Sequence, residues 1–350
     1  MPSRVRISLT LAAIALWMVA APLIWRGALS AWGPAKENLP LSYLPAAEAR
    51  RERLAFESKP IDELKTMDPV AVIIGDSMAG RVDPVRLGEL LDNRQVATLV
   101  APATGPGWWY LAFKNYVIPS GITPSWVFVF MRDTNLTDPM FRLLEPYRGK
   151  LDQVARDLEP ELNEIVGTRL QGPWHRVHSA TDQFYELGRA RTWLEPKLAP
   201  WLARVAVGNR QKQRLLDGLN AAFGLEHLRP IPQADLDAAD DRDADFNANI
   251  NTSLMPSWVE LARANNLRVV FIKVLRRPTD QGLPPPESPA LQQYTKDLRA
   301  WIEANGMVFF DDRDNPAMAK LPYADGDHVD GEGMTPYAEL LAAQLERIKK

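Results

Sequence analysis

The sequence contains no cysteine and only four histidines. Without cysteine, the chain forms no disulfide, uses no thiol in catalysis and binds no metal through sulfur. The cellular compartment stays open, because exported proteins can fold without disulfides. A mechanism that needs an imidazole as a base must choose among His175, His178, His227 and His328.

A strong charge imbalance is also missing. The formal net charge is −3, which gives no reason to expect nucleic-acid binding. The apolar and charged fractions, 46% and 24%, are ordinary for a globular protein and argue against extensive disorder. We find no glycine-rich phosphate loop, no metal-ligand spacing and no internal repeat, and we therefore expect neither a cofactor nor a metal.

One long apolar run is present near the N-terminus. Residues 7–25 carry no charge, and as a helix they would span about 28 Å, close to the thickness of the bilayer core. We expect an uncleaved transmembrane anchor; the alternative is a signal peptide cleaved near residues 28–30. Arg4 and Arg6 favour a cytoplasmic N-terminus, which would place the rest of the chain outside the cytoplasmic membrane.

Composition divides the chain into three predicted parts. Residues 1–30 form the anchor, and residues 31–68, rich in proline, alanine and charge, form a tether with a short helix near 46–56. Residues 69–350 form an α/β domain. From about 141 to 250 the pattern becomes helical, which predicts a helical insertion larger than a single crossover needs.

Short apolar runs alternate with helical patterns on both sides of that insertion. Such alternation predicts an α/β fold with one doubly wound parallel sheet. The expected strands are residues 70–74, 96–100, 126–130, 268–274 and 307–310. One helix is expected to begin near residue 83. The other expected helices cover residues 108–116, 253–265, 291–305 and 336–349.

The first strand leads directly into Gly75, Asp76 and Ser77. A glycine lets the backbone turn sharply, so that Ser77 follows the carboxyl end of a buried parallel strand. Open α/β sheets bind their ligands at that edge. We therefore interpret Ser77 as a nucleophile.

A serine hydroxyl needs a base that removes its proton, and His328 is the candidate. The imidazole in turn needs an acceptor on its other nitrogen. Asp325, three residues earlier, is able to turn its carboxylate back onto the ring, whereas the adjacent Asp327 is expected to point away. Each piece alone is a weak signal; their positions, after the first strand and before the last helix, favour a catalytic site.

These residues resemble the SGNH/GDSL hydrolase family. Its first block, a strand followed by Gly-Asp-Ser, is similar to residues 73–77, and its last block, Asp-x-x-His, is similar to residues 325–328. The resemblance implies a flavodoxin-like three-layer fold in which Ser77 is the nucleophile, His328 the base and Asp325 its orienting acid. It covers about residues 70–135 and 250–345.

The middle blocks of the family supply the donors that stabilise the oxyanion. By the resemblance, Gly105 or Gly107 would contribute a backbone N–H beside that of Ser77. The usual Gly-x-Asn-Asp is absent after the third strand, where residues 131–135 read Met-Arg-Asp-Thr-Asn. Asn135 is the candidate donor, and Arg132 is the alternative, unless it pairs with the neighbouring Asp133.

An anchor, a Gly-Asp-Ser block and a late Asp-Gly-Asp-His together resemble a subgroup that includes alginate O-acetyltransferase-like proteins. The resemblance implies acyl transfer to a cell-surface polysaccharide in the bacterial periplasm, from a single-pass inner-membrane protein beside a membrane-bound O-acyltransferase. Two alternatives remain: hydrolysis of acyl esters by the same residues, and an inactive anchored binding or assembly protein on a hydrolase fold.

Overall fold

The computed structural model describes residues 56–143, 147–156, 159–171, 244–279 and 281–348, together with positions 20, 23, 24, 27, 28 and 31. The chain divides into two compact units. One comprises Met1–Ala55 and Asp157–His227, and the other comprises Phe56–Arg156 and Leu228–Lys350. The second unit carries the sheet and all the candidate site residues.

A five-stranded sheet lies at the centre of this second unit, with the strand order β2-β1-β3-β4-β5. Every pairing in it is parallel, so all the carboxyl ends of its strands share one edge. The predicted doubly wound parallel sheet is therefore confirmed. The strands are β1 (Ala71–Gly75), β2 (Val96–Val100), β3 (Trp126–Met131), β4 (Val269–Lys273) and β5 (Val308–Asp311).

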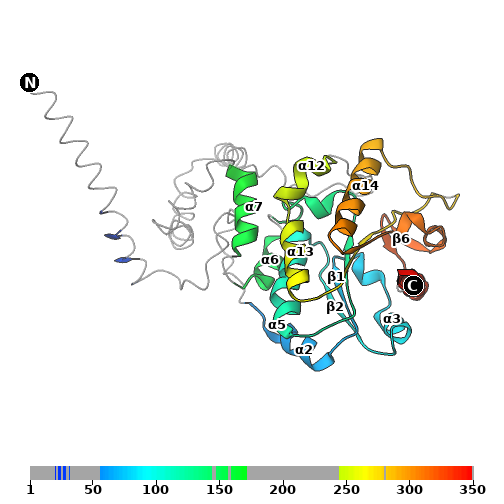
Figure 1. Ribbon diagram of the computed structural model, residues 1–350, viewed down its shortest axis with the longest axis horizontal. Helices are drawn as coiled ribbons and strands as arrows, with labels where there is room; N and C mark the ends of the chain where they lie inside the picture. Colours follow the sequence, from blue (N-terminus) through cyan, green and yellow to red (C-terminus); the bar gives the residue numbers. More distant parts are fainter. Residues whose placement is uncertain are drawn as a thin grey trace, which may run out of the picture. The chain divides into compact units, whose positions relative to one another are not determined.

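Helices cover both faces of the sheet. Figure 1 shows α3 and α13 on opposite sides of β1. The helices of this unit are α2 (Lys59–Met67), α3 (Pro84–Leu90), α4 (Pro106–Ala112), α5 (Ile118–Ser120), α6 (Arg148–Val154), α12 (Phe246–Asn249), α13 (Met255–Ala264), α14 (Pro289–Ala304) and α15 (Met334–Ile348). A π-helical turn, Phe113–Val117, joins α4 to α5.

On one face, the apolar side chains of α3 and α15 pack on the inner strands. Leu87 of α3 and Leu341 of α15 are fully buried in one cluster with Ile73 and Phe128. On the other face, the ring of Trp258 stacks on Phe113 at 5.2 Å between centroids and meets β4 through Phe271. Because both faces are covered, the inner strands are apolar rather than alternating, except for Lys273 at the end of β4.

Asp83 explains why α3 begins where the sequence predicts. Its carboxylate accepts hydrogen bonds from the backbone N–H groups of Val85 and Arg86, and Pro84 follows it at the first helical position. The hydroxyl of Thr335 also donates to Asp83, at 2.7 Å. The start of α3 is thereby tied to the start of α15, next to the segment that carries His328.

The structure contains a helix and a hairpin that the sequence does not predict. Helix α2 lies in the stretch assigned to the tether, and a two-stranded hairpin, β6 (Tyr323–Asp325) and β7 (His328–Val329), precedes α15. The hairpin was missed because its strands are too short to give an alternating pattern.

Several expectations lie outside the described residues. These are the apolar run 7–25, apart from three positions, the helix near 46–56 and most of the helical insertion 141–250. Within that insertion the structure describes α6, α12 and α7 (Pro160–Gln171), the last of which belongs to the first unit. Among the described residues, no helix has the length and apolar character needed to cross a membrane.

Candidate active site

Ser77 and His328 meet at the carboxyl edge of the sheet. The Nε2 atom of His328 lies 2.7 Å from the Oγ atom of Ser77, although 251 positions separate the two residues. Gly75 makes the turn before Ser77, and a Cβ there would come within 2.6 Å of the Cβ of Ala79. The tight strand-to-loop turn thus requires glycine, and it presents the serine to the histidine.

The β6–β7 hairpin positions the histidine. The backbone N–H of Arg277, which follows β4, donates to the carbonyl of Gly326 in the hairpin turn at 2.6 Å. On the other side, Gly333 packs so closely that a Cβ there would lie 2.3 Å from Val329. The hairpin is therefore held between the edge of the sheet and the start of α15.

Two aspartates flank the imidazole in sequence. An Oδ1 atom of Asp327 lies 3.2 Å from Nδ1 of His328, so the expectation that this carboxylate points away is wrong. A carboxylate on an adjacent residue reaches Nδ1 here because the chain turns between β6 and β7. The register of the hairpin pairs the backbone of Asp325 with that of His328. The side chain of Asp325 lies outside the described part, and its role stays a prediction.

Arg132 is tied to the histidine through Asp327. Its Nη1 atom donates to Oδ2 of Asp327 at 2.6 Å, and its Nε lies 3.6 Å from Oδ2 of Asp133. Burial opposes the charge of the guanidinium, but Asp327 and Asp133 hold its pKa above the ordinary value. Arg132 therefore does lie beside Asp133, but its shorter contact is with Asp327.

Asn135 lies in the loop that follows β3, close to Arg132. Its Oδ1 atom accepts a hydrogen bond from the backbone N–H of Arg132 at 3.1 Å. The residue is 7% exposed. The bond to Oδ1 fixes the orientation of the amide, whose nitrogen is the group able to donate to a substrate oxygen.

Gly105 and Gly107 begin the helix after β2. Gly105 precedes α4 in extended conformation, and Gly107 lies in its first turn. A Cβ at position 105 would come within 2.1 Å of the carbonyl oxygen of Phe141, so glycine is required by this close approach. Because β2 neighbours β1 in parallel, both glycines follow the same edge of the sheet as Ser77.

Asp76, the residue before the nucleophile candidate, is buried. Its two carboxylate oxygens bind Nη1 of Arg142 at 2.8 Å and the backbone N–H of Met78 at 3.0 Å. Burial raises the pKa of this carboxyl, and the charge of Arg142 opposes the shift. Asp76 therefore shapes the turn around Ser77, and Arg142 compensates its charge. Sequence reasoning missed Arg142 because no motif marks it.

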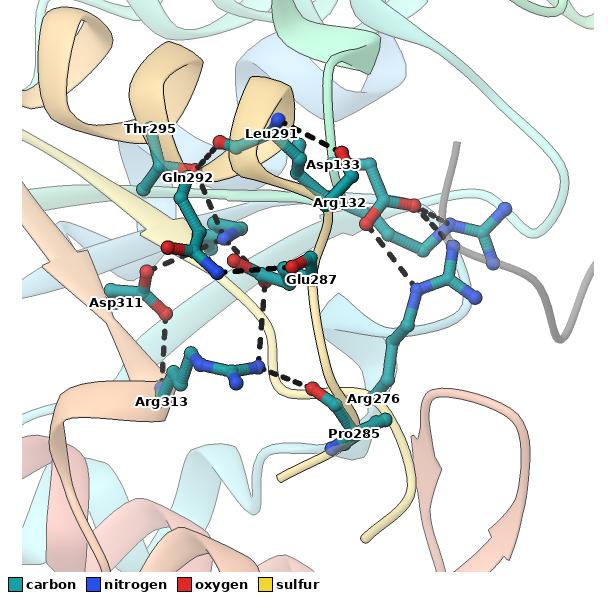
Figure 2. Close-up of polar contacts among 12 residues, drawn as sticks. Arg132, Asp133, Arg276, Pro285, Glu287, Leu291, Gln292, Thr295, Asp311 and Arg313 are labelled. Atoms are coloured by element: carbon teal, nitrogen blue, oxygen red, sulfur yellow. Dashed lines mark hydrogen bonds and ion pairs between the residues drawn. The ribbon is translucent and has the colours of Figure 1, made fainter. Parts of the chain in front are cut away.

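A second polar cluster lies near Asp133, where Lys273 at the end of β4 meets residues of α14, of β5 and of the segment before α14 (Figure 2). Nζ of Lys273 binds Glu287 at 2.7 Å and Thr295 at 3.0 Å, and lies 3.4 Å from Asp311. Figure 2 shows Glu287 at the centre of these contacts and Arg276 directed at Asp133. A small pocket adjoins the cluster, bounded by Asp133, Arg276, Pro285, Pro286, Glu287 and Arg313.

The buried lysine explains how the segment that precedes α14 is held. Lys273 lies at the end of β4 and is 2% exposed, and Glu287 precedes Ser288, the N-cap of α14. A buried ammonium needs such partners, because an unpaired charge inside a protein is costly. In the described part of the chain, no three histidine, aspartate or glutamate side chains are grouped as metal ligands.

The sequence matches no known protein-family profile and has no significant match among curated protein sequences. Among the solved structures that are similar to the chain are two crystal structures. A candidate acylhydrolase from Bacteroides fragilis shares 13% identity, with a TM-score of 0.35, over 80% of this chain and 88% of its own. A GDSL-like lipase from Bacteroides thetaiotaomicron shares 14% identity, with a TM-score of 0.36, over 83% of this chain and 100% of its own.

Proposed function

We propose that the chain transfers an acyl group through an ester on Ser77. The observation that carries this proposal is the 2.7 Å contact between Oγ of Ser77 and Nε2 of His328. This distance lies within the reach that a general base needs. An acyltransferase or esterase of the SGNH/GDSL kind fits this arrangement, as the sequence blocks around Ser77 and His328 suggest.

In the first half-reaction, Oγ of Ser77 attacks the carbonyl carbon of an acyl ester while Nε2 of His328 takes the hydroxyl proton. The tetrahedral intermediate then breaks its bond to the leaving oxygen, which receives the proton from His328. In the second half-reaction, an acceptor hydroxyl gives its proton to His328 and attacks the acyl-serine. Collapse releases the new ester, and Ser77 regains its proton.

The other groups have supporting roles in this proposal. The negative oxygen of each intermediate receives hydrogen bonds from the backbone N–H groups of Ser77 and of Gly105 or Gly107, and from the amide nitrogen of Asn135. Asp325 orients the imidazole, as the pairing of its backbone with His328 across the hairpin supports. The contacts of Arg132 with two carboxylates favour Asn135 over Arg132 as an oxyanion donor.

The acceptor in this proposal is a hydroxyl of a cell-surface polysaccharide, and the acyl group is acetyl. An anchor within residues 1–30 holds the domain at the periplasmic side of the inner membrane. A membrane-bound O-acyltransferase beside it supplies the acyl groups. What supports these points is the sequence pattern: the apolar run 7–25 and the Asp-Gly-Asp-His segment.

An acceptor assay tests the proposal. The full chain is incubated with p-nitrophenyl acetate, with and without O-deacetylated bacterial polysaccharide fragments, and the products are analysed by mass spectrometry. We expect nitrophenol release in both cases and acetylated fragments in the second, with neither product from Ser77→Ala. Free acetate alone would contradict transfer and establish ester hydrolysis. No nitrophenol from the intact protein would contradict acyl chemistry altogether.

A further inference from the structure

Asp327 is the carboxylate that joins the catalytic histidine to a second charged residue. One of its oxygens lies 3.2 Å from Nδ1 of His328, and the other accepts from Nη1 of Arg132 at 2.6 Å. The four side chains Arg132, Asp327, His328 and Ser77 therefore form one continuous line of contacts, from the end of β3 to the loop after β1.

This line of contacts is shielded from water along most of its length. The side chains of Arg132, Asp327 and His328 are 11%, 9% and 21% exposed. Charges in such surroundings interact more strongly than they do in water. A change of charge at Arg132 or Asp327 should therefore be felt at the imidazole.

The contact between His328 and Ser77 determines which tautomer of the imidazole is able to act as a base. To accept the serine proton, Nε2 must be unprotonated, so the ring hydrogen must lie on Nδ1, facing Asp327. The carboxylate stabilises this form and the imidazolium that arises during the reaction. Left alone, however, a buried carboxylate would also favour a protonated ring before the reaction, when a proton on Nε2 blocks catalysis.

Arg132 opposes that tendency. Its guanidinium shares the carboxylate of Asp327 and reduces the negative potential at Nδ1. Other charged groups lie near the pair: Asp133 after β3, and Asp76 with Arg142 near the nucleophile. The hairpin also carries Asp325, whose backbone pairs with that of His328. Burial raises the pKa of Asp76, and the charges of Asp327 and Arg132 add smaller, opposite effects. The ion pairs Arg132–Asp327 and Arg142–Asp76 are therefore within electrostatic reach of each other.

We infer that the ion pair Arg132–Asp327 is a positioning device for His328. Asp327 is a second acid on the imidazole in addition to Asp325, and Arg132 sets how strongly this acid acts. This inference rests on the proposed function of Ser77 and His328. It assigns Arg132 a role different from that of an oxyanion donor.

The two halves of the pair should change the pH profile in opposite directions. The readout is the rate at which a fluorophosphonate modifies Ser77, measured from pH 5 to 9 on the full chain. In Asp327→Asn, the acid limb of the profile should move down by about one pH unit, with a plateau at least about tenfold lower. In Arg132→Gln the limb should move up by about one unit, and Arg132→Lys should restore much of the wild-type profile.

Matched controls separate this effect from loss of structure. The surface ion pair Arg299–Asp314 offers the same charge changes away from the hairpin, and Arg299→Gln and Asp314→Asn should leave the limb in place. Circular dichroism and thermal unfolding establish that each variant is folded. Shifts of the same sign in Asp327→Asn and Arg132→Gln, or reduced rates with an unmoved limb, would overturn the inference. No modification of the wild-type protein would instead contradict the proposed function.

Discussion

Replacing Ser77 by alanine should reduce acetyl-ester turnover by at least about a thousandfold while leaving the protein folded. The alanine removes only the hydroxyl that lies 2.7 Å from His328. His328→Ala should cost a similar factor, because it removes the base. Combining both changes should cost little more than either alone, since a nucleophile and its base act as a unit. Initial rates with p-nitrophenyl acetate measure these effects.

The control is Ser257→Ala, in the first turn of α13, which should stay within about twofold of the wild type. Denaturant unfolding of Ser77→Ala should give a free energy within about 1 kcal/mol of the wild-type value. If the two factors of rate loss multiplied in the double variant, or if Ser77→Ala kept wild-type turnover, the joint role of the two residues would be contradicted.

Asp312 should make the stability of the protein fall as the pH rises. This residue follows β5, is 2% exposed and accepts a hydrogen bond from the hydroxyl of Tyr337 at 2.5 Å. Burial raises the pKa of its carboxyl to about 7, although the bond from Tyr337 opposes the shift. The folded state therefore holds a proton that the unfolded chain releases near pH 4.

The direction in which stability changes with pH follows from proton binding. Between about pH 4 and 7 the folded state binds more protons than the unfolded state, so the free energy of unfolding decreases with rising pH and levels off above about 7. From pH 5 to 8 this group should remove about 2–3 kcal/mol. An asparagine side chain does not ionise, so the Asp312→Asn variant should not lose this stability as the pH rises.

Urea unfolding of both proteins at pH 5, 6, 7 and 8 measures the difference. The pKa values of Asp76 and Asp311 are also raised, mainly by burial, but both carboxyls are present in the variant and cancel in the comparison. If the free energy of unfolding changed equally with pH in the wild-type protein and in Asp312→Asn, Asp312 would not be the titrating group.

The sheet could be predicted because its sequence signals are local. Each inner strand is a short apolar run, and Asp83 and Ser288 mark the starts of α3 and α14 by accepting hydrogen bonds from helix N–H groups. Ser77 follows β1 along the chain and the hairpin with His328 follows β5, and the carboxyl ends of these two parallel strands share one edge of the sheet, so the order of the chain predicts that the two residues meet there.

The charged surroundings of the histidine were not predictable in the same way. The placement of Asp327 depends on a tight hairpin whose strands are too short to show periodicity, so spacing alone pointed to Asp325. Arg142 and Lys273 reach their partners across the fold, over 66 positions for Asp76 and 38 for Asp311. No local pattern specifies such pairs, because tertiary packing decides which charges meet.

The most direct test of the account is to locate the adduct of a fluorophosphonate on the full chain by peptide mass spectrometry. We expect a single modification, on Ser77, that is lost in Ser77→Ala and strongly reduced in His328→Ala. An unmodified Ser77 in the folded wild-type protein, or modification that persists unchanged without His328, would contradict an activated serine at this site.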